Sequence, residues 1–316
     1  MAGPCSRAQN PACMDAPATD AAHRPPVWLS LGLSMVLAGA VYPVTAFALD
    51  STTPITIATL RALLGGVLLT LVLPLFGSRL PRSRTHWRWA FLIGLGNTSI
   101  TQVAISVATD RAGAAVASVL LNSSPFMVAI ASRILFAERI TRLRAVGLVI
   151  GFVGVLAIVV ADPGDVSGGA RLGFGLGLAL IGAAAWAASG LGMRELTRRE
   201  PDLDIPGMTA AQFLAGAVPL VPLAILAGGS TDWSAHGLIA AVAFLIVGGQ
   251  VLVYVGFNDA LGRWPPTRVY AWTFVAPASA VVIEAVRGNL PGPLSTAGIV
   301  LVIVGVAIVN APRAEA

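Results

Sequence analysis

The chain has 316 residues, of which 56% are hydrophobic and only 11% are charged. A soluble domain carries about a quarter charged residues, so this composition excludes a soluble globular protein. The formal net charge of +5 rests on 20 basic residues, all of them arginine. They lie in short segments between apolar runs, and this distribution argues against a nucleic-acid partner.

The first 26 residues are polar and rich in alanine and proline. No apolar run precedes Val27, so this segment does not have the form of a signal peptide. We expect a disordered cytoplasmic tail, and Met14 is an alternative start that leaves the rest unchanged. Cys5 and Cys13 both fall in this tail and have no metal or redox spacing.

Ten apolar stretches of about 20 residues follow, each long enough to span a bilayer. Backbone polar groups must be satisfied within a spanning segment, so these stretches are predicted to be helices. The predicted spans are residues 27–49, 54–77, 88–109, 112–136, 143–161, 172–193, 207–227, 235–257, 266–286 and 294–311. The expected fold class is therefore an all-α integral membrane protein with ten transmembrane helices.

The arginines predict the orientation. With the N-terminus inside, fifteen arginines fall on the inner side and three on the outer side, and Arg61 and Arg133 fall within spans. Short cytoplasmic loops carry an excess of Arg and Lys. We therefore expect a multi-pass protein of the bacterial cytoplasmic (inner) membrane, with both termini in the cytoplasm.

The two halves of the chain resemble each other at offsets between 145 and 152 residues. The matched pairs are Gly147 with Gly298, Gly154 with Gly305, Pro125 with Pro277, Leu31 with Leu176, and Ala108 with Ala260. We interpret them as a duplicated unit of five helices, residues 27–162 and 171–311. Because five is odd, the second copy must enter the membrane from the opposite side, which is the inverted repeat of many secondary transporters.

On these features the chain resembles the EamA-type family of the drug/metabolite transporter (DMT) superfamily. The residues that carry the resemblance are Pro54–Arg61, Ala108, the small-residue run Ala114–Ser118, Pro125, the pair Glu138–Arg139, and Gly147, Gly151 and Gly154. The resemblance implies two inverted five-helix repeats and, most commonly, export of amino acids or related metabolites. The second half departs from the first, because Gln212 stands at the Arg61 position and Asn289–Leu290 at the Glu138–Arg139 position.

Charged residues within or beside the spans are candidates for gating or coupling. Burying them costs several kcal/mol unless they are paired or face a cavity. For Arg61, snorkelling to the interface or pairing with a helix end is the favoured reading, and attraction of a substrate carboxylate or a gating pair is the alternative. Arg133 and Glu284 each lie about a turn from the end of a span, where a structural role is the favoured reading. Glu284 is nonetheless the best intramembrane acid if transport is coupled to protons.

Three further residues are assigned to gating or helix shape. Glu138 stands at the cytoplasmic end of the fourth span and is expected to anchor the loop or an inner gate. Pro125 and Pro277 remove a backbone hydrogen bond within their spans and should bend them. The carbonyls freed there could face a central cavity.

Neutral polar and aromatic side chains inside the spans are the candidates for a substrate cavity. Several follow i, i+4 spacing and so share one helix face. The predicted substrate-binding residues are Tyr42, Asn97, Thr101, Gln102, Asn122, Ser123, Trp186, Gln250, Tyr254, Asn258, Tyr270 and Trp272. Such a lining suits a small zwitterionic or uncharged amphipathic metabolite. Hydrogen bonding between helices is the alternative use of these residues.

The favoured function is a secondary transporter that exports small metabolites by alternating access. An uptake permease or a channel-like facilitator remains open as an alternative. An intramembrane enzyme is less favoured, because His23, His86 and His236 lie outside the spans and no nucleophile has a base in reach. The absence of a P-loop argues against an ATP-driven pump. We expect a lipid bilayer, a small-molecule substrate and, as an open case, protons as partners, with no cofactor and no metal.

Overall fold

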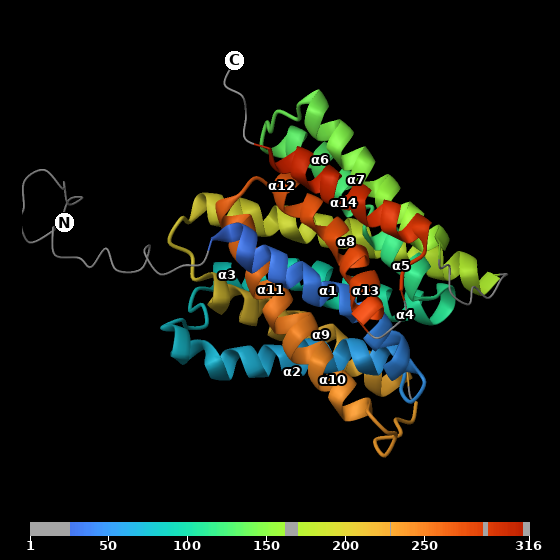
Figure 1. Cartoon of the computed structure of the whole chain (residues 1–316). Coiled ribbons are helices and arrows are strands. Elements are labelled where there is room, and N and C mark those ends of the chain that lie inside the picture. The colour runs from blue at the N-terminus through green and yellow to red at the C-terminus, as the bar shows by residue number, and fades with distance from the viewer. Residues whose placement is uncertain (1–25, 162–169, 228, 287–289, 312–316) are drawn as a thin grey trace, which may run out of the picture.

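The computed structural model describes residues 26–161, 170–227, 229–286 and 290–311 (Figure 1). Across these ranges the chain is helical and contains no strand. Nine helical stretches within them are long and apolar enough to cross a bilayer. Apart from Pro26, the predicted tail lies outside the described residues.

The first repeat runs from α1 to α7. Its helices are α1 (Val27–Leu49), α2 (Pro54–Val72), α3 (Arg84–Gly94), α4 (Thr101–Ala112), α5 (Ala114–Leu121), α6 (Ser124–Leu135) and α7 (Arg142–Ala161). A 3-10 turn, Leu73–Phe76, continues α2, and a π-helical turn, Leu95–Ile100, joins α3 to α4.

The second repeat has the same order of elements. Its helices are α8 (Ala170–Arg199), α9 (Ile205–Ala227), α10 (Leu238–Ile246), α11 (Val253–Arg263), α12 (Pro266–Ala271), α13 (Val275–Val286) and α14 (Pro293–Asn310). A π-helical turn, Val247–Leu252, joins α10 to α11, and a 3-10 turn, Trp272–Phe274, lies between α12 and α13.

Three predicted boundaries need correction. The eighth span was expected to end at residue 257, but α11 continues to Arg263. The third span was expected to begin at residue 88, but α3 begins at Arg84, because the Ser83 hydroxyl accepts hydrogen bonds from the first backbone N–H groups of the helix. The sixth span was expected to end at residue 193, but α8 continues to Arg199. Glu195 pairs there with Arg198 at 2.9 Å and with Arg199 at 2.7 Å, contacts that stabilise an exposed helix end.

Two predicted spans are interrupted at their prolines rather than merely bent. The span at 112–136 breaks at Asn122–Ser123, and Pro125 lies in the first turn of α6. The span at 266–286 is divided by the 3-10 turn, and Pro277 lies in the first turn of α13. Proline lacks an N–H and its ring clashes with the carbonyl four residues earlier, so regular helix ends at that carbonyl.

Packing of α7 against α14 shows the inversion directly. A Cβ on Gly154 would lie 2.7 Å from the Gly298 carbonyl oxygen, and a Cβ on Gly305 would lie 2.7 Å from the Gly147 carbonyl oxygen. The paired numbers rise in α7 as they fall in α14, so the two helices run antiparallel. Since Gly147 matches Gly298 and Gly154 matches Gly305 in the repeat, two copies of one helix run in opposite directions. The fold is therefore two inverted five-helix repeats.

Other equivalent helices also pack around this symmetry. α2 packs on its equivalent α9, where the Thr59 hydroxyl donates to the Leu220 carbonyl at 3.3 Å. Contacts of α1 with α11 are matched by contacts of α8 with α4. The two π-helical turns start at Leu95 and Val247, an offset of 152 residues. The irregular turns are thus part of the repeat.

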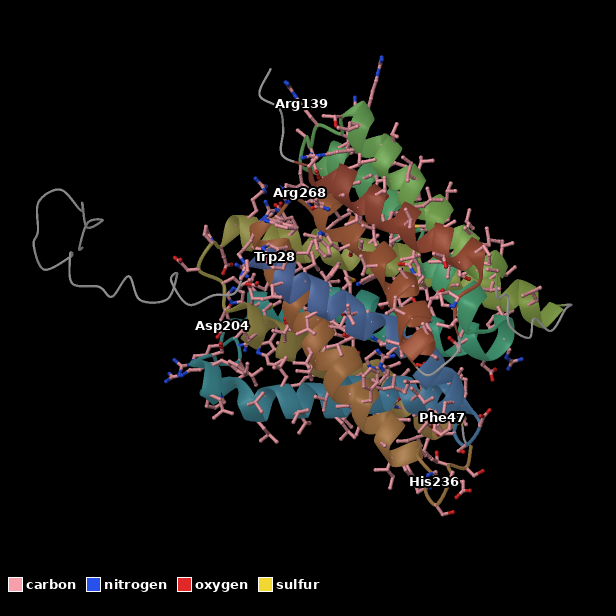
Figure 2. The ribbon with its side chains drawn as sticks, viewed as in Figure 1. Trp28, Phe47, Arg139, Asp204, His236 and Arg268 are labelled. Atoms are coloured by element: carbon pink, nitrogen blue, oxygen red, sulfur yellow. The ribbon has the colours of Figure 1, made fainter. Side chains whose placement is uncertain are left out.

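The bundle has two ends of different composition. Arg139 and Arg268 lie toward the end where α1 begins, near Trp28, whereas Phe47 and His236 lie toward the other (Figure 2). We call the first the arginine-rich end and the second the opposite end. α14 finishes at the arginine-rich end, because Arg268 hydrogen bonds to Asn310, the last residue of α14.

We predict that Gly154→Ala lowers the free energy of unfolding by about 1–3 kcal/mol, because the added methyl has no room against the backbone of α14. Gly177→Ala is the matched control, since nothing lies within 4 Å of a Cβ there. Thermal unfolding of the detergent-purified proteins measures both changes. Equal midpoints for the two variants would contradict the close α7–α14 contact.

Candidate functional site

A network of buried amides and hydroxyls lies at the centre of the bundle. The Gln102 side-chain amide on α4 donates to the Gln250 side-chain oxygen at 2.9 Å and to the Tyr254 hydroxyl at 3.2 Å. All three side chains are buried. Gln102 and Tyr254 are equivalent in the repeat, at an offset of 152, and equivalent residues touch only near the symmetry axis. The centre of the network therefore lies on the pseudo-twofold axis.

Each π-helical turn offers a backbone carbonyl to this centre. The Tyr254 hydroxyl donates to the Asn97 carbonyl at 3.2 Å, and the Arg61 Nη2 donates to the Gly249 carbonyl at 3.1 Å. Asn97 and Gly249 occupy equivalent positions in the two turns. A π-helical turn shifts the backbone hydrogen-bond register, and such turns are frequent at functional sites. Here both turns bind side chains from the other repeat.

The network continues toward the arginine-rich end through Gln212 on α9. Its side-chain oxygen accepts from the Asn97 amide at 3.2 Å and from the Asn258 amide at 3.5 Å. Asn258 also donates to the Thr209 hydroxyl at 3.0 Å. Gln212 and Thr209 were not among the predicted site residues. The sequence could have indicated them, because they are two polar residues three positions apart in an otherwise apolar span.

An aromatic cluster borders the network. The Tyr270 hydroxyl donates to the Trp186 carbonyl at 2.7 Å, and the two ring centroids are 5.2 Å apart. Phe257, another residue absent from the predicted set, stacks on Trp186 at 5.2 Å. Trp272 packs instead near Gly32 of α1, where a Cβ would lie 3.3 Å from its ring. The structure thus brings Trp186 and Tyr270 together.

Several predicted residues serve their own helices. The Asn122 amide donates to the Ser118 carbonyl at 2.7 Å, and the Ser123 hydroxyl donates to the Leu120 carbonyl at 2.6 Å. These bonds satisfy carbonyls near the break before α6, where we expected carbonyls to face a cavity. The Thr101 hydroxyl donates to two glycine carbonyls, at 2.8 and 3.1 Å, and so joins α4 to α8.

Two charged candidates remain, Arg133 and Glu284. Arg133 is exposed in the last turn of α6. Glu284 belongs to α13, and its side chain lies outside what the structure describes.

A cavity of about 530 Å³ lies at the opposite end, between α1, α5, α7, α13 and α14. Tyr42 and Pro43 line it from α1, Ser118 from α5, and Pro277 from α13. Both repeats therefore contribute to its wall. Tyr42 is the one predicted substrate-binding residue among its lining residues.

The equivalent place at the arginine-rich end is closed by a group of polar contacts that we call the latch, formed by Glu138, Arg144, Thr267, Arg268 and Asn310. The Thr267 hydroxyl donates to the Glu138 carboxylate at 3.0 Å, and Arg144 stands 3.8 Å from the same carboxylate. Arg268 donates to the Asn310 side chain at 3.3 Å. These contacts join the loop after α6 to α12, and α12 to α14.

The repeat explains why one end is open and the other closed. The twofold exchanges α5 with α12, α7 with α14 and α6 with α13, so it carries the cavity onto the latch. Ser118, which lines the cavity, is equivalent to Tyr270 at an offset of 152. The Tyr270 ring is fully buried and packs against Trp186 and Phe257, at a position where the other half has a serine.

This arrangement defines a class of protein: a helical membrane transporter built from inverted repeats. Residues 27–160 and 173–311 match the model of the EamA-like transporter family. Because the match covers most of both repeats, the chain belongs to the EamA-like transporter family.

Relatives agree with this assignment over nearly the whole chain. An uncharacterized transporter of Archaeoglobus fulgidus is 26% identical over 90% of this chain and 99% of its own length. The uncharacterized transporter YvbV of Bacillus subtilis is 26% identical over 89% of this chain and 90% of its own length. The uncharacterized inner membrane transporter YedA of Escherichia coli is 27% identical over 84% of this chain and 83% of its own length. A crystal structure with a TM-score of 0.74 and 18% identity covers 89% of this chain and 95% of its own, and shows the same fold.

We predict that Gln102→Leu destabilises the protein by about 1–3 kcal/mol, because it leaves the Gln250 oxygen without its donor in a buried place. Thr70→Val is the matched control, since the Thr70 hydroxyl bonds only within its own helix, to Gly66. Thermal unfolding in detergent measures both. The double variant Gln102→Leu/Gln250→Leu should lose less than the sum of the single variants. Additive losses, or a Gln102→Leu variant as stable as the control, would contradict the buried pair.

Proposed function

We propose that this chain is a secondary carrier that exports small zwitterionic or uncharged amphipathic metabolites, amino acids among them, by alternating access. The observation that carries the proposal is the cavity at one end of the pseudo-twofold axis and the latch at the equivalent place on the other. Two halves with one fold can exchange these roles, which opens the arginine-rich end and closes the opposite end.

The chemistry of the centre supports such a cargo. Gln102, Gln250, Tyr254 and Asn258 are neutral donors and acceptors, and the Trp186–Tyr270 pair adds an aromatic wall. Amides and hydroxyls can bind both an ammonium and a carboxylate, while rings accommodate an apolar side chain. A fully charged or purely apolar cargo would suit these groups less well.

The proposed orientation is compatible with export. Since the positive-inside rule assigns arginine-rich loops to the cytoplasm, the arginine-rich end and both termini are proposed to be cytoplasmic. The cavity then faces outward, which suits release of an exported metabolite. An uptake permease could use the same two states in reverse. A channel is less consistent, because the latch closes one end of the bundle while the other holds a cavity.

Counterflow in proteoliposomes tests the carrier. Vesicles loaded with an unlabelled amino acid should accumulate the labelled one from outside, transiently and with saturation, because one binding site alternates between the two faces. The assay is run with a panel of amino acids and with protein-free vesicles as the control. A flux that rises linearly with concentration and shows no counterflow would favour a channel and contradict the proposal.

Cysteine labelling tests the orientation. Cys5 and Cys13 are first replaced by serine, and Thr141→Cys and Ser234→Cys are then introduced singly, both at exposed loop positions. We predict that an impermeant maleimide labels intact cells at position 234 and not at position 141, which reacts only after permeabilisation. The reverse pattern would invert the proposed topology.

A further inference from the structure

Arg61 is the one fully buried arginine among the described residues, with 2% of its surface exposed. Only its Nη2 has a hydrogen bond, to the Gly249 carbonyl. The Nε and Nη1 groups are buried and have no partner within the described part of the chain. A guanidinium offers five N–H donors, so most of this capacity is unused.

The neighbours of Arg61 do not neutralise its charge. Arg61 takes part in none of the ion pairs of the described residues, and the ionisable groups beside it are the phenols of Tyr254 and Tyr42. A cation buried in a membrane protein without a counter-charge is costly, and such residues usually mark a substrate or ion path. Snorkelling does not account for Arg61, because its guanidinium donates to a central π-helical turn rather than reaching water.

The repeat shows what differs at this place. Gln212 and Asn258 bond to each other in the second repeat, and their equivalents are Arg61 and Ser106 in the first. The Ser106 hydroxyl is buried and has no partner in the described chain. Serine is shorter than asparagine, so the hydrogen bond between Asn258 and Gln212 in the second repeat has no counterpart between Ser106 and Arg61 in the first. The unpaired groups thus fall at a position that the symmetry identifies.

Further unpartnered groups follow the same face of α4. The Gln102 side-chain oxygen and the Ser106 and Thr109 hydroxyls are all buried without a partner in the described residues. Their spacing of i, i+4 and i+7 places them in one row. α4 packs against α1 and α2, the helices that carry Tyr42 and Arg61. Gln102 bonds to Gln250, the residue next to Gly249, so the row begins at the depth of the Arg61 guanidinium.

Tyr42 connects this region to the cavity. Its side chain lines the cavity from α1. The preceding residue, Val41, and the Arg61 Nη2 group both lie within 4 Å of a Cβ added at Gly249. A molecule that enters from the opposite end would meet Tyr42 before it reached the guanidinium.

We infer that Arg61 binds the carboxylate of the cargo, with the Ser106 and Thr109 hydroxyls as additional donors and the Gln102 oxygen as acceptor for an ammonium group. The substrate class is then the α-amino acids and similar carboxylate zwitterions. This assignment rests on the proposed carrier function, and it adds the recognised group and the residue that recognises it.

A binding assay on the full chain in nanodiscs tests the assignment. The probes are L-phenylalanine, L-leucine and L-serine, each paired with its carboxamide, and the readout is the thermal unfolding midpoint against probe concentration. At least one acid should raise the midpoint, and its amide should not. Arg61→Gln should weaken apparent affinity for that acid by about tenfold or more, the value of one hydrogen bond to a charged group.

Three variants make the result specific. Arg61→Lys keeps the charge and should retain part of the affinity if Arg61→Gln proves unstable. Ser106→Ala should weaken binding of the acid by a few-fold. Arg84→Gln, at an exposed position that begins α3, should bind as the wild type does. Equal stabilisation by acid and amide, unchanged affinity in Arg61→Gln, or no stabilisation by any of the three acids would each overturn the assignment.

Failure here is distinguishable from failure of the carrier proposal. Counterflow of a cargo without a carboxylate, unaffected by Arg61→Gln, would leave the carrier standing and remove Arg61 from its site. Carboxylate binding at Arg61 without any counterflow would do the reverse.

Discussion

A backbone that crosses hydrocarbon must satisfy its hydrogen bonds within the protein, and this constraint shapes the centre of the molecule. The two π-helical turns and the two broken spans depart from regular helix in the interior of their spans rather than at the ends. Protein groups bond to a carbonyl at each departure: Tyr254 to Asn97, Arg61 to Gly249, Asn122 to Ser118 and Thr273 to Tyr270. The irregular backbone is therefore confined to the interior, where a polar site is tolerated.

The inverted repeat makes this constraint apply at two equivalent places. Because the repeat is inverted, each irregular turn appears twice and on opposite sides of one axis, and the Gln102–Tyr254 contact lies on that axis. Close packing of the α7 and α14 glycines holds the two copies together. The halves differ in side-chain size at the equivalent positions Ser118 and Tyr270, and in charge at the equivalent positions Arg61 and Gln212. The first difference accompanies the cavity, and the second leaves a cation without an opposing charge.

Much of this architecture could be predicted from the sequence, for clear reasons. Apolar length identifies spans, and a constant offset between glycines and prolines identifies the repeat whatever the surroundings. Polar residues inside apolar runs identified Gln102, Gln250 and Tyr254 as candidates, and the structure buries all three. The snorkelling favoured for Arg61 is wrong, because Arg61 is buried and donates to the Gly249 carbonyl. Polar positions within the spans could thus be identified from single residues, without knowledge of their neighbours in space.

Partners and irregular turns could not be predicted in the same way. These helices are apolar on nearly every side, so no hydrophobic pattern indicates which face looks inward. Gln212 was recognised only as the counterpart of Arg61, because its bonds to Asn97 and Asn258 depend on how closely α3 approaches α9. That approach depends on Gly94 and Gly216. A Cβ added at Gly94 would lie 2.2 Å from the backbone carbonyl oxygen of Gln212, and one added at Gly216 would lie 2.6 Å from that of Gly94. Asn122 and Ser123 are polar residues of the same kind as the site residues. At the break before Pro125, however, they donate to carbonyls of their own helical stretch, those of Ser118 and Leu120.

The central claim, that the two ends exchange open and closed forms, is tested most directly by distances between spin labels in lipid nanodiscs. One pair, Phe47 and Val160, spans the cavity end on α1 and α7, and a second, Arg198 and Ala311, spans the arginine-rich end beside α8 and α14; all four positions are exposed. Breaking the latch with Glu138→Gln should lengthen the second distance and shorten the first, because one motion joins them. Distances that stay unchanged at both ends, or that lengthen together, would contradict alternating access.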